Sequence, residues 1–242
     1  MFRSLLRADF LVFLKHRRAL IISMVLPVFV LISTSGNKAT NKFGGAEFVI
    51  GLAISYALLS TALVGYALTV ARDREKGVFQ RLRVTPAPTW TIMSSRITVQ
   101  LVYNLITSLV VIVVAVIIHG LSLDVGQYLL VLAIAVVGAA LFLSLGQALV
   151  GLVRSTTAVN AVGRLLFIVL WLLGLLGPSG ILGDTVKTIT EWTPVGALMR
   201  LFADTINDTA WVDQDWYSLL ACFGYIVVFA FIGIRWFRWE SR

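Results

Sequence analysis

The sequence contains little charge, two histidines and a single cysteine. Only 13% of its 242 residues are charged, about half the share that is usual in soluble globular domains. The lone Cys222 excludes an internal disulfide, and no cluster of cysteine, histidine and carboxylate residues has the spacing of a metal site. A G-x-x-x-x-G-K-S/T phosphate loop is also absent, so the sequence offers no nucleotide cradle of that type.

Apolar residues dominate instead. They make up 59% of the chain, and the mean hydropathy is +0.92. A water-soluble domain of this length has no core large enough to bury so much apolar surface. The composition therefore excludes a cytosolic enzyme, a disordered chain and a secreted disulfide scaffold, and it indicates a membrane protein.

Six apolar stretches are each long enough to cross a hydrocarbon core of about 30 Å, which takes about 20 helical residues. They lie at 19–36, 46–71, 97–119, 127–153, 157–178 and 216–236. Before them, the helical spacing of Phe2, Leu5 and Phe10 favours an interfacial amphipathic helix over 1–18, rather than a cleaved signal peptide. The sequence thus predicts an all-α polytopic membrane protein with six transmembrane helices, folded as a single domain over 1–242.

The basic residues predict the orientation of this bundle. In the six-span topology, 15 of the 20 Lys and Arg residues fall on the side that holds both termini, and only four fall on the opposite side. Because basic flanks stay in the cytoplasm, both termini are expected to be cytoplasmic, with the protein in the inner membrane. A membrane surface also accounts for the net charge of +8, so no nucleic-acid partner is expected.

The cytoplasmic link at 72–88 combines charged residues with an apolar stripe. The pattern predicts a short amphipathic helix that ends before Pro86, because proline disfavours helical geometry in the residue preceding it. One face of this helix carries side chains at helical spacing: Glu75, Val78, Phe79 and Leu82. The stripe favours a docking element for another protein; a basic loop held against lipid headgroups is the alternative.

Here the sequence is similar to a known family. The run Arg74-Glu75-Lys76-Gly77, followed by Leu82 and Thr85-Pro86, resembles the coupling-helix signature of ATP-binding-cassette (ABC) permeases of the type-two exporter family. The glycine-rich fourth span and the Trp192-Thr193-Pro194 stretch before the last span also resemble that family. One departure is Val78, where the family often has threonine.

This resemblance implies a permease that hydrolyses nothing itself. Two copies, or one copy and a related permease, would pair with two cytoplasmic ATPase subunits, which would bind ATP and magnesium; this chain would bind no cofactor directly. ATP-driven closure of the ATPase subunits would push on the coupling helix and export a hydrophobic or amphiphilic substrate such as a drug, a lipid or a glycan. The residues implied in coupling are Arg74, Glu75, Lys76, Gly77, Val78, Phe79, Leu82, Arg83 and Pro86.

The family also has short helices that dip into the outer leaflet before the last span, which the resemblance places within the extracytoplasmic segment 179–212. Within the second span, small residues repeat every four positions and predict a close-packing seam, within one subunit or between two. The members of this seam are Ala57, Thr61, Gly65 and Thr69.

Polar residues at membrane depth leave two interpretations open. The third span carries Gln100, Asn104 and Ser108 on one stripe, which suits either interhelical hydrogen bonds or the wall of a translocation path. Asn160 and Arg164 lie one turn apart on the fifth span. Arg164 either reaches toward the headgroups or faces the bundle, where it would bind an anionic group.

An intramembrane serine protease is the enzymatic alternative. Gly177-Pro178-Ser179-Gly180 resembles the nucleophile motif of rhomboid-type proteases, but a serine nucleophile needs a nearby base. Only His16 and His119 are available, and neither lies in the last span, so the motif is better interpreted as a helix break. A membrane subunit that recruits a partner without transporting anything is the other alternative.

Overall fold

The computed structural model describes residues 17–35, 45–79, 89–177, 183–209 and 211–236. Every regular element in these ranges is helical. In chain order they are α2 (Arg17–Ser33), α4 (Ala46–Leu58), η1 (Leu59–Gly65), α5 (Tyr66–Glu75), α7 (Thr89–His119), α8 (Val125–Leu152), α9 (Thr156–Leu176), α10 (Asp184–Glu191), α11 (Pro194–Ile206) and α12 (Asp213–Arg235).

Five helices among the described residues are long and apolar enough to cross a membrane. They are Ala46–Glu75, Ser94–His119, Val125–Leu152, Thr156–Leu176 and Asp213–Arg235. These helices coincide with the second to sixth predicted spans, so the chain is an all-α polytopic membrane protein.

The first predicted span, 19–36, falls on α2, which is not among these five helices. It has 17 residues and contains Pro27, a length of about 26 Å at 1.5 Å per residue. The predicted interfacial helix at 1–18 lies outside the described residues except for its last two, which begin α2.

The second span contains a π-helical segment that interrupts its regular pitch. Residues 46–75 form one continuous helix, but its seven residues Leu59–Gly65 are wound as a π-helix. A π-helix has more residues per turn than an α-helix, so positions four apart no longer fall on one line across it. Ala57 and Thr61 are buried, whereas Gly65 and Thr69 are exposed. The π-helical segment therefore divides the predicted seam: Ala57 and Thr61 pack within this chain, whereas Gly65 and Thr69 lie on its outer surface.

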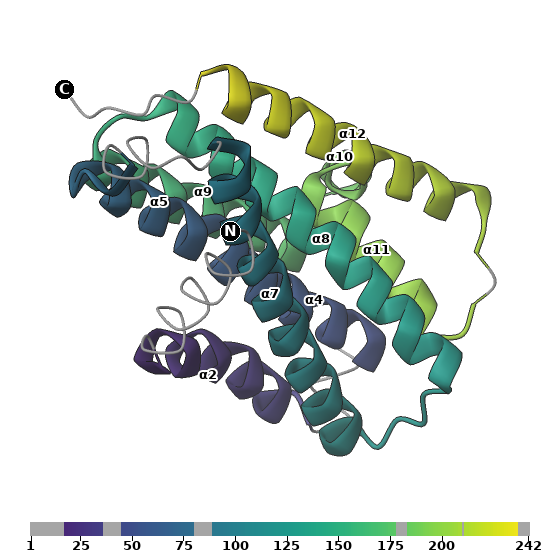
Figure 1. Ribbon diagram of the computed structural model, residues 1–242. Helices are drawn as coiled ribbons and strands as arrows, with labels where there is room; N and C mark the ends of the chain where they lie inside the picture. The colour runs from purple at the N-terminus through teal and green to yellow at the C-terminus, as the bar shows by residue number, and fades with distance from the viewer. Residues whose placement is uncertain (1–16, 36–44, 80–88, 178–182, 210, 237–242) are drawn as a thin grey trace.

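Helix α8 lies inside the bundle, and α12 packs along it (Figure 1). The glycines of α8 allow the neighbouring helices to approach its backbone closely. A Cβ at Gly146 would lie 3.1 Å from the carbonyl oxygens of Ala62 and Leu63 in η1, and one at Gly151 would lie 3.3 Å from the carbonyl oxygen of Gly233 in α12. Backbone therefore meets backbone at both places, and α8 has little freedom to slide without moving η1 and α12.

Two helices precede α12, within the segment predicted at 179–212. Helix α11 begins at a Thr193 cap, whose hydroxyl accepts the Gly196 amide at 3.1 Å, and Pro194 fills its first position. It is buried against α4, α8, α9 and α12. A Cβ at Gly138, in the middle of α8, would lie 2.7 Å from the Leu198 side chain. Helix α11 therefore lies among the apolar helices rather than on their surface.

Candidate functional site

The sequence predicts coupling through residues 72–88, and the structure describes the first part of this stretch, up to Phe79. Helix α5 ends at Glu75, and the Gly77 amide donates to the Arg74 carbonyl at 3.1 Å. Gly77 has φ +66°, a left-handed conformation typical of the residue that terminates a helix. Lys76 and Gly77 form a turn before Val78 and Phe79. We call residues 73–79 the α5 junction.

This turn corrects one prediction. Glu75, Val78 and Phe79 were expected on one face of a single helix, but the left-handed Gly77 separates the first from the other two. Glu75 and Lys76 are exposed, whereas Phe79 is fully buried. Leu82, Arg83 and Pro86 lie outside the described residues.

Arg74 bonds the junction to the end of α8. Its guanidinium donates to the backbone carbonyls of Val150 at 2.9 Å, Val153 at 2.8 Å and Arg154 at 2.6 Å. The side chain is only 2% exposed. Carbonyls at a helix C-terminus lack intrahelical donors and carry partial negative charge, so a buried arginine cation is well placed there.

Glu75 bonds the same junction to the start of α9. Its Oε1 accepts the backbone amide of Thr156 at 3.2 Å. The Ser155 hydroxyl accepts the Ala158 amide at 3.2 Å, so two side chains satisfy free amides at this helix N-terminus. The negative charge of Glu75 also suits the positive end of the α9 dipole.

A third bond joins the junction to α7. Arg96 Nη1 lies 2.5 Å from Asp73 Oδ2, and the same guanidinium lies 4.8 Å from the centre of the Phe79 ring. Phe79 therefore contacts this chain's own α7, and the earlier expectation that it contacts an ATPase is wrong because its ring is buried. Sequence reasoning missed the roles of Asp73 and Arg96, which are 23 residues apart.

The polar stripe on α7 faces the π-helical segment. The Gln100 side-chain amide donates to the Thr61 carbonyl at 3.1 Å, and the Thr61 hydroxyl bonds to the Asn104 side-chain oxygen. The Asn104 side-chain amide donates to the Gln100 carbonyl at 2.7 Å. The Ser108 hydroxyl is buried and has no hydrogen-bond partner. Gln100 and Asn104 thus make interhelical hydrogen bonds within the chain.

The two polar residues of α9 lie elsewhere. Arg164 is exposed beside the exposed Leu165, so its side chain faces away from this chain's own bundle. Asn160 is half-buried, and its Oδ1 is buried without a hydrogen-bond partner. The structure does not bring either residue to the α7 stripe.

A charged cluster that the sequence analysis did not single out joins α11 to α12. Arg200 Nε lies 2.8 Å from Asp215 Oδ1 and 3.5 Å from Asp204 Oδ2. Asp215 is 1% exposed and also accepts the Val212 amide at 2.8 Å. Burial, together with the hydrogen bond and charge of Asp215, raises the pKa of Asp204 to about 6, against the opposing charge of Arg200. The four-residue spacing of Arg200 and Asp204 was the available sequence signal.

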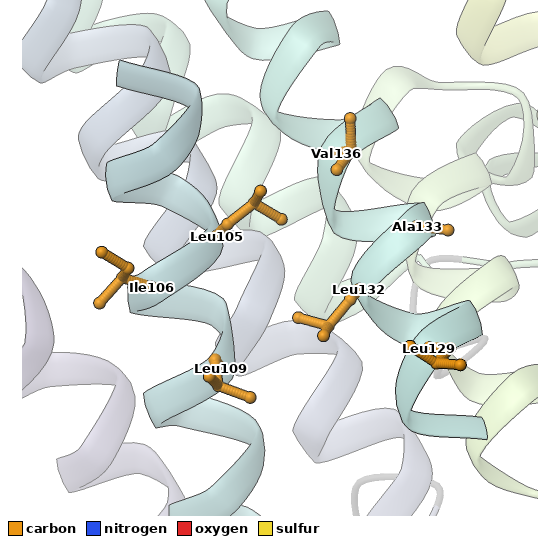
Figure 2. A pocket seen from close by; sticks show the side chains of 7 residues that line it. All are labelled: Leu105, Ile106, Leu109, Leu129, Leu132, Ala133 and Val136. Atoms are coloured by element: carbon orange, nitrogen blue, oxygen red, sulfur yellow. The ribbon is translucent and has the colours of Figure 1, made fainter. Parts of the chain in front are cut away.

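The described part of the bundle includes a hollow and a more open groove. One, of about 250 Å³, borders this cluster and is lined by Phe48, Glu191, Gly196, Met199, Arg200, Ala203 and Asp204. The other, of about 360 Å³, is an open apolar groove between α7 and α8, and the side chains of Leu105 and Leu132 project into the space between the two helices (Figure 2). Its lining has no polar side chain, so it offers nothing to orient a polar ligand.

Pro178, Ser179 and Gly180 of the rhomboid-like motif lie outside the described ranges. Within those ranges, no group of three or more histidine, cysteine or acidic residues is placed to hold a metal ion.

Long apolar helices packed round α8, joined at one end by buried polar contacts, define a multi-pass membrane protein. Comparison with known families makes the class specific. The family of ABC-2 family transporter proteins matches residues 18–235. The chain therefore belongs to the ABC-2 transporter family and is a transport permease of the ABC type. No curated protein matches the chain.

Proposed function

We propose that this chain is the membrane-spanning subunit of an ABC exporter. In this proposal a partner ATPase binds and hydrolyses ATP with magnesium, and the chain moves a hydrophobic or amphiphilic substrate out across the cytoplasmic membrane. The observation that carries the proposal is the α5 junction: the exposed turn at Lys76 directly follows residues that bond to α7, α8 and α9. Membership of the ABC-2 family supports it.

The proposed topology has six spans, with α2 as the first. Both termini and the α5 junction are then cytoplasmic, which the positions of the basic residues support. In this orientation α10 and α11 belong to a re-entrant segment that enters from the opposite side. The contact between Gly138 and Leu198 supports this placement, because Gly138 lies near the middle of α8.

The proposed assembly contains two ATPase subunits and a second permease, either a copy or a relative. The exposed Gly65 and Thr69 suit close packing against such a partner, because small residues let helix backbones approach. We also propose that Asn160 and Arg164 face the space between the two permeases, since Arg164 faces away from its own bundle. Gln100 and Asn104 are less suited to a path, because they bond within the chain.

The mechanism follows from the junction. Closure of the ATPase subunits would push on the exposed turn at Lys76. The turn has little freedom to yield alone, because its neighbours Asp73, Arg74 and Phe79 contact other helices. The push is therefore expected to displace the ends of several spans together, which is what alternation between inward- and outward-facing states requires.

The test is purification of the assembly through an affinity tag on this chain, expressed in its native host. We expect an ATPase subunit to co-purify in equal amount and to hydrolyse ATP with sensitivity to vanadate. Isolation of the chain without any ATPase, or an assembly without vanadate-sensitive hydrolysis, would overturn the proposal.

A further inference from the structure

Two consecutive residues at the end of α5 bond to two different helices, and this pairing goes beyond docking. We propose that Arg74 and Glu75 form a transmission clamp that makes the α8–α9 turn, residues 153–155, move together with α5. The inference rests on the proposed function, since it concerns how a push from an ATPase travels onward. It assigns Arg74 and Glu75 as positioning residues within this chain rather than as contacts to the partner.

The Arg74 half of the clamp holds backbone rather than side chains. Its three acceptors are carbonyls from the last turn of α8 and the residues just after it. Arg74 is therefore bonded to the backbone at the end of α8. A guanidinium has donors in a fixed fork and can bridge several carbonyls at once, which a lysine ammonium on a flexible stem does less well. The buried site therefore favours arginine over lysine.

The Glu75 half holds the next helix. Successive residues of an α-helix point about 100° apart, so neighbours at the end of α5 reach in different directions. Arg74 reaches α8, and Glu75 reaches the first amide of α9 at Thr156. The turn between α8 and α9 is therefore held at both ends. The Arg74 cation bonds to carbonyls at the end of α8, and the Glu75 anion bonds to an amide at the start of α9.

Movement of α8 is expected to reach the far side of the bundle. Helix α8 packs closely against η1 at Gly146 and against α12 at Gly151. At Gly138 it packs against the Leu198 side chain of α11. Close-packed interfaces of this kind transmit displacement because they hold no space to absorb it. The hollow beside Ala203 on α11 is therefore expected to change shape when the clamp is pulled.

The experiment uses the tagged assembly from the native host, with Ala203→Cys as a reporter. The native Cys222 is fully buried and gives little background. The labelling rate with a membrane-impermeant maleimide is compared between the nucleotide-free and the ATP–vanadate states. We expect the rate to differ at least about fivefold in the otherwise unchanged protein, the lower bound typical of coupled sites. An unchanged rate would overturn the route from α5 to α11.

Clamp variants then separate transmission from docking. Arg74→Ala and Glu75→Ala should keep the co-purified ATPase and its hydrolysis while losing the change in labelling rate. Glu75→Gln should retain the change, because its amide oxygen still accepts the Thr156 N–H, whereas Arg74→Lys should retain it only in part. The control is Arg72→Ala, an exposed neighbour of like charge, which should behave as the unchanged protein.

The outcomes distinguish the two proposals. Loss of the ATPase from Arg74→Ala, with Glu75→Gln equally affected, would show docking and overturn the clamp. A full labelling change in both alanine variants would overturn it as well. Absence of any ATPase from the unchanged protein would instead refute the proposed function, and the clamp with it.

Discussion

Nε of Arg200 on α11 lies 2.8 Å from Oδ1 of Asp215 on α12, and this ion pair fastens α11 to the first turn of the last span. Asp215 is 1% exposed, while the Arg200 side chain keeps 29% of its surface exposed. Asp215 is thus the more buried member of the pair, and a buried carboxylate without its arginine partner would destabilise the fold.

Replacement of Asp215 by alanine should destabilise the protein. It removes the nearer of the two acidic partners of Arg200 and the acceptor of the Val212 amide, so we expect the free energy of unfolding to fall by about 3 kcal/mol. Thermal unfolding in detergent measures the change. Asp213→Ala, an exposed acid in the same helical turn, should change stability by no more than about 0.5 kcal/mol. Equal effects of the two variants would contradict a structural ion pair.

Asp204 should make stability depend on pH. Its pKa rises from 3.8 to about 6 in the fold, so between these values the folded state binds more protons than the unfolded state. Its contribution is then present at low pH and is lost as pH rises through about 6. The charged groups that act on it are Asp215 and Arg200, and Glu191 lines the same hollow.

Asp204→Asn isolates this contribution, because the amide stays neutral. The unfolding temperature of the variant, measured relative to that of the unchanged protein, should therefore increase as pH rises from 3.8 to above about 6. Parallel pH profiles of the two proteins would show that Asp204 ionises normally.

Gly146 should tolerate no large side chain. A Cβ there would lie 3.1 Å from two carbonyl oxygens of η1, and backbone has little freedom to retreat. Gly146→Leu is expected to lower the free energy of unfolding by about 1–3 kcal/mol. The matched control is Gly224→Leu on α12, where a Cβ meets nothing within 4 Å. The idea fails if thermal unfolding shifts equally in both variants.

Phe79 should act on stability rather than on docking. Its ring is fully buried beneath Arg96, so Phe79→Ala is expected to cost about 3 kcal/mol through the cavity that it leaves. Unfolding of the purified chain measures this. Val78→Ala, at the half-buried neighbour, should cost clearly less. An unchanged unfolding temperature for Phe79→Ala would place the ring outside the fold.

Lys76 is the better probe of docking because it is exposed at the turn of the α5 junction. Lys76→Glu should reduce the amount of co-purified ATPase severalfold, since charge reversal at an interface opposes association. Stability of the isolated chain should change by no more than about 0.5 kcal/mol. Undiminished recovery of the ATPase would show that the docking surface does not include this turn.

Part of the fold was accessible without tertiary information. The second to sixth spans follow from apolar runs, since a membrane helix must satisfy its own backbone and needs a local stretch of apolar side chains. The end of α5 was less accessible: Lys76-Gly77 carries the signal of a helix stop, yet the periodicity of Glu75, Val78 and Phe79 suggested one helix. Similarly, the seam through Thr61 was predicted at α-helical pitch, and the π-helical segment breaks it.

Sequence alone determined the membrane class, the apolar spans and the motif around Arg74 and Glu75, because hydropathy, turn chemistry and short motifs are properties of neighbouring residues. Only the tertiary structure decided what those two side chains hold. The carbonyls that Arg74 binds lie 76 to 80 residues further along the chain, and backbone groups are the same in every residue, so nothing in the sequence marks them as its partners.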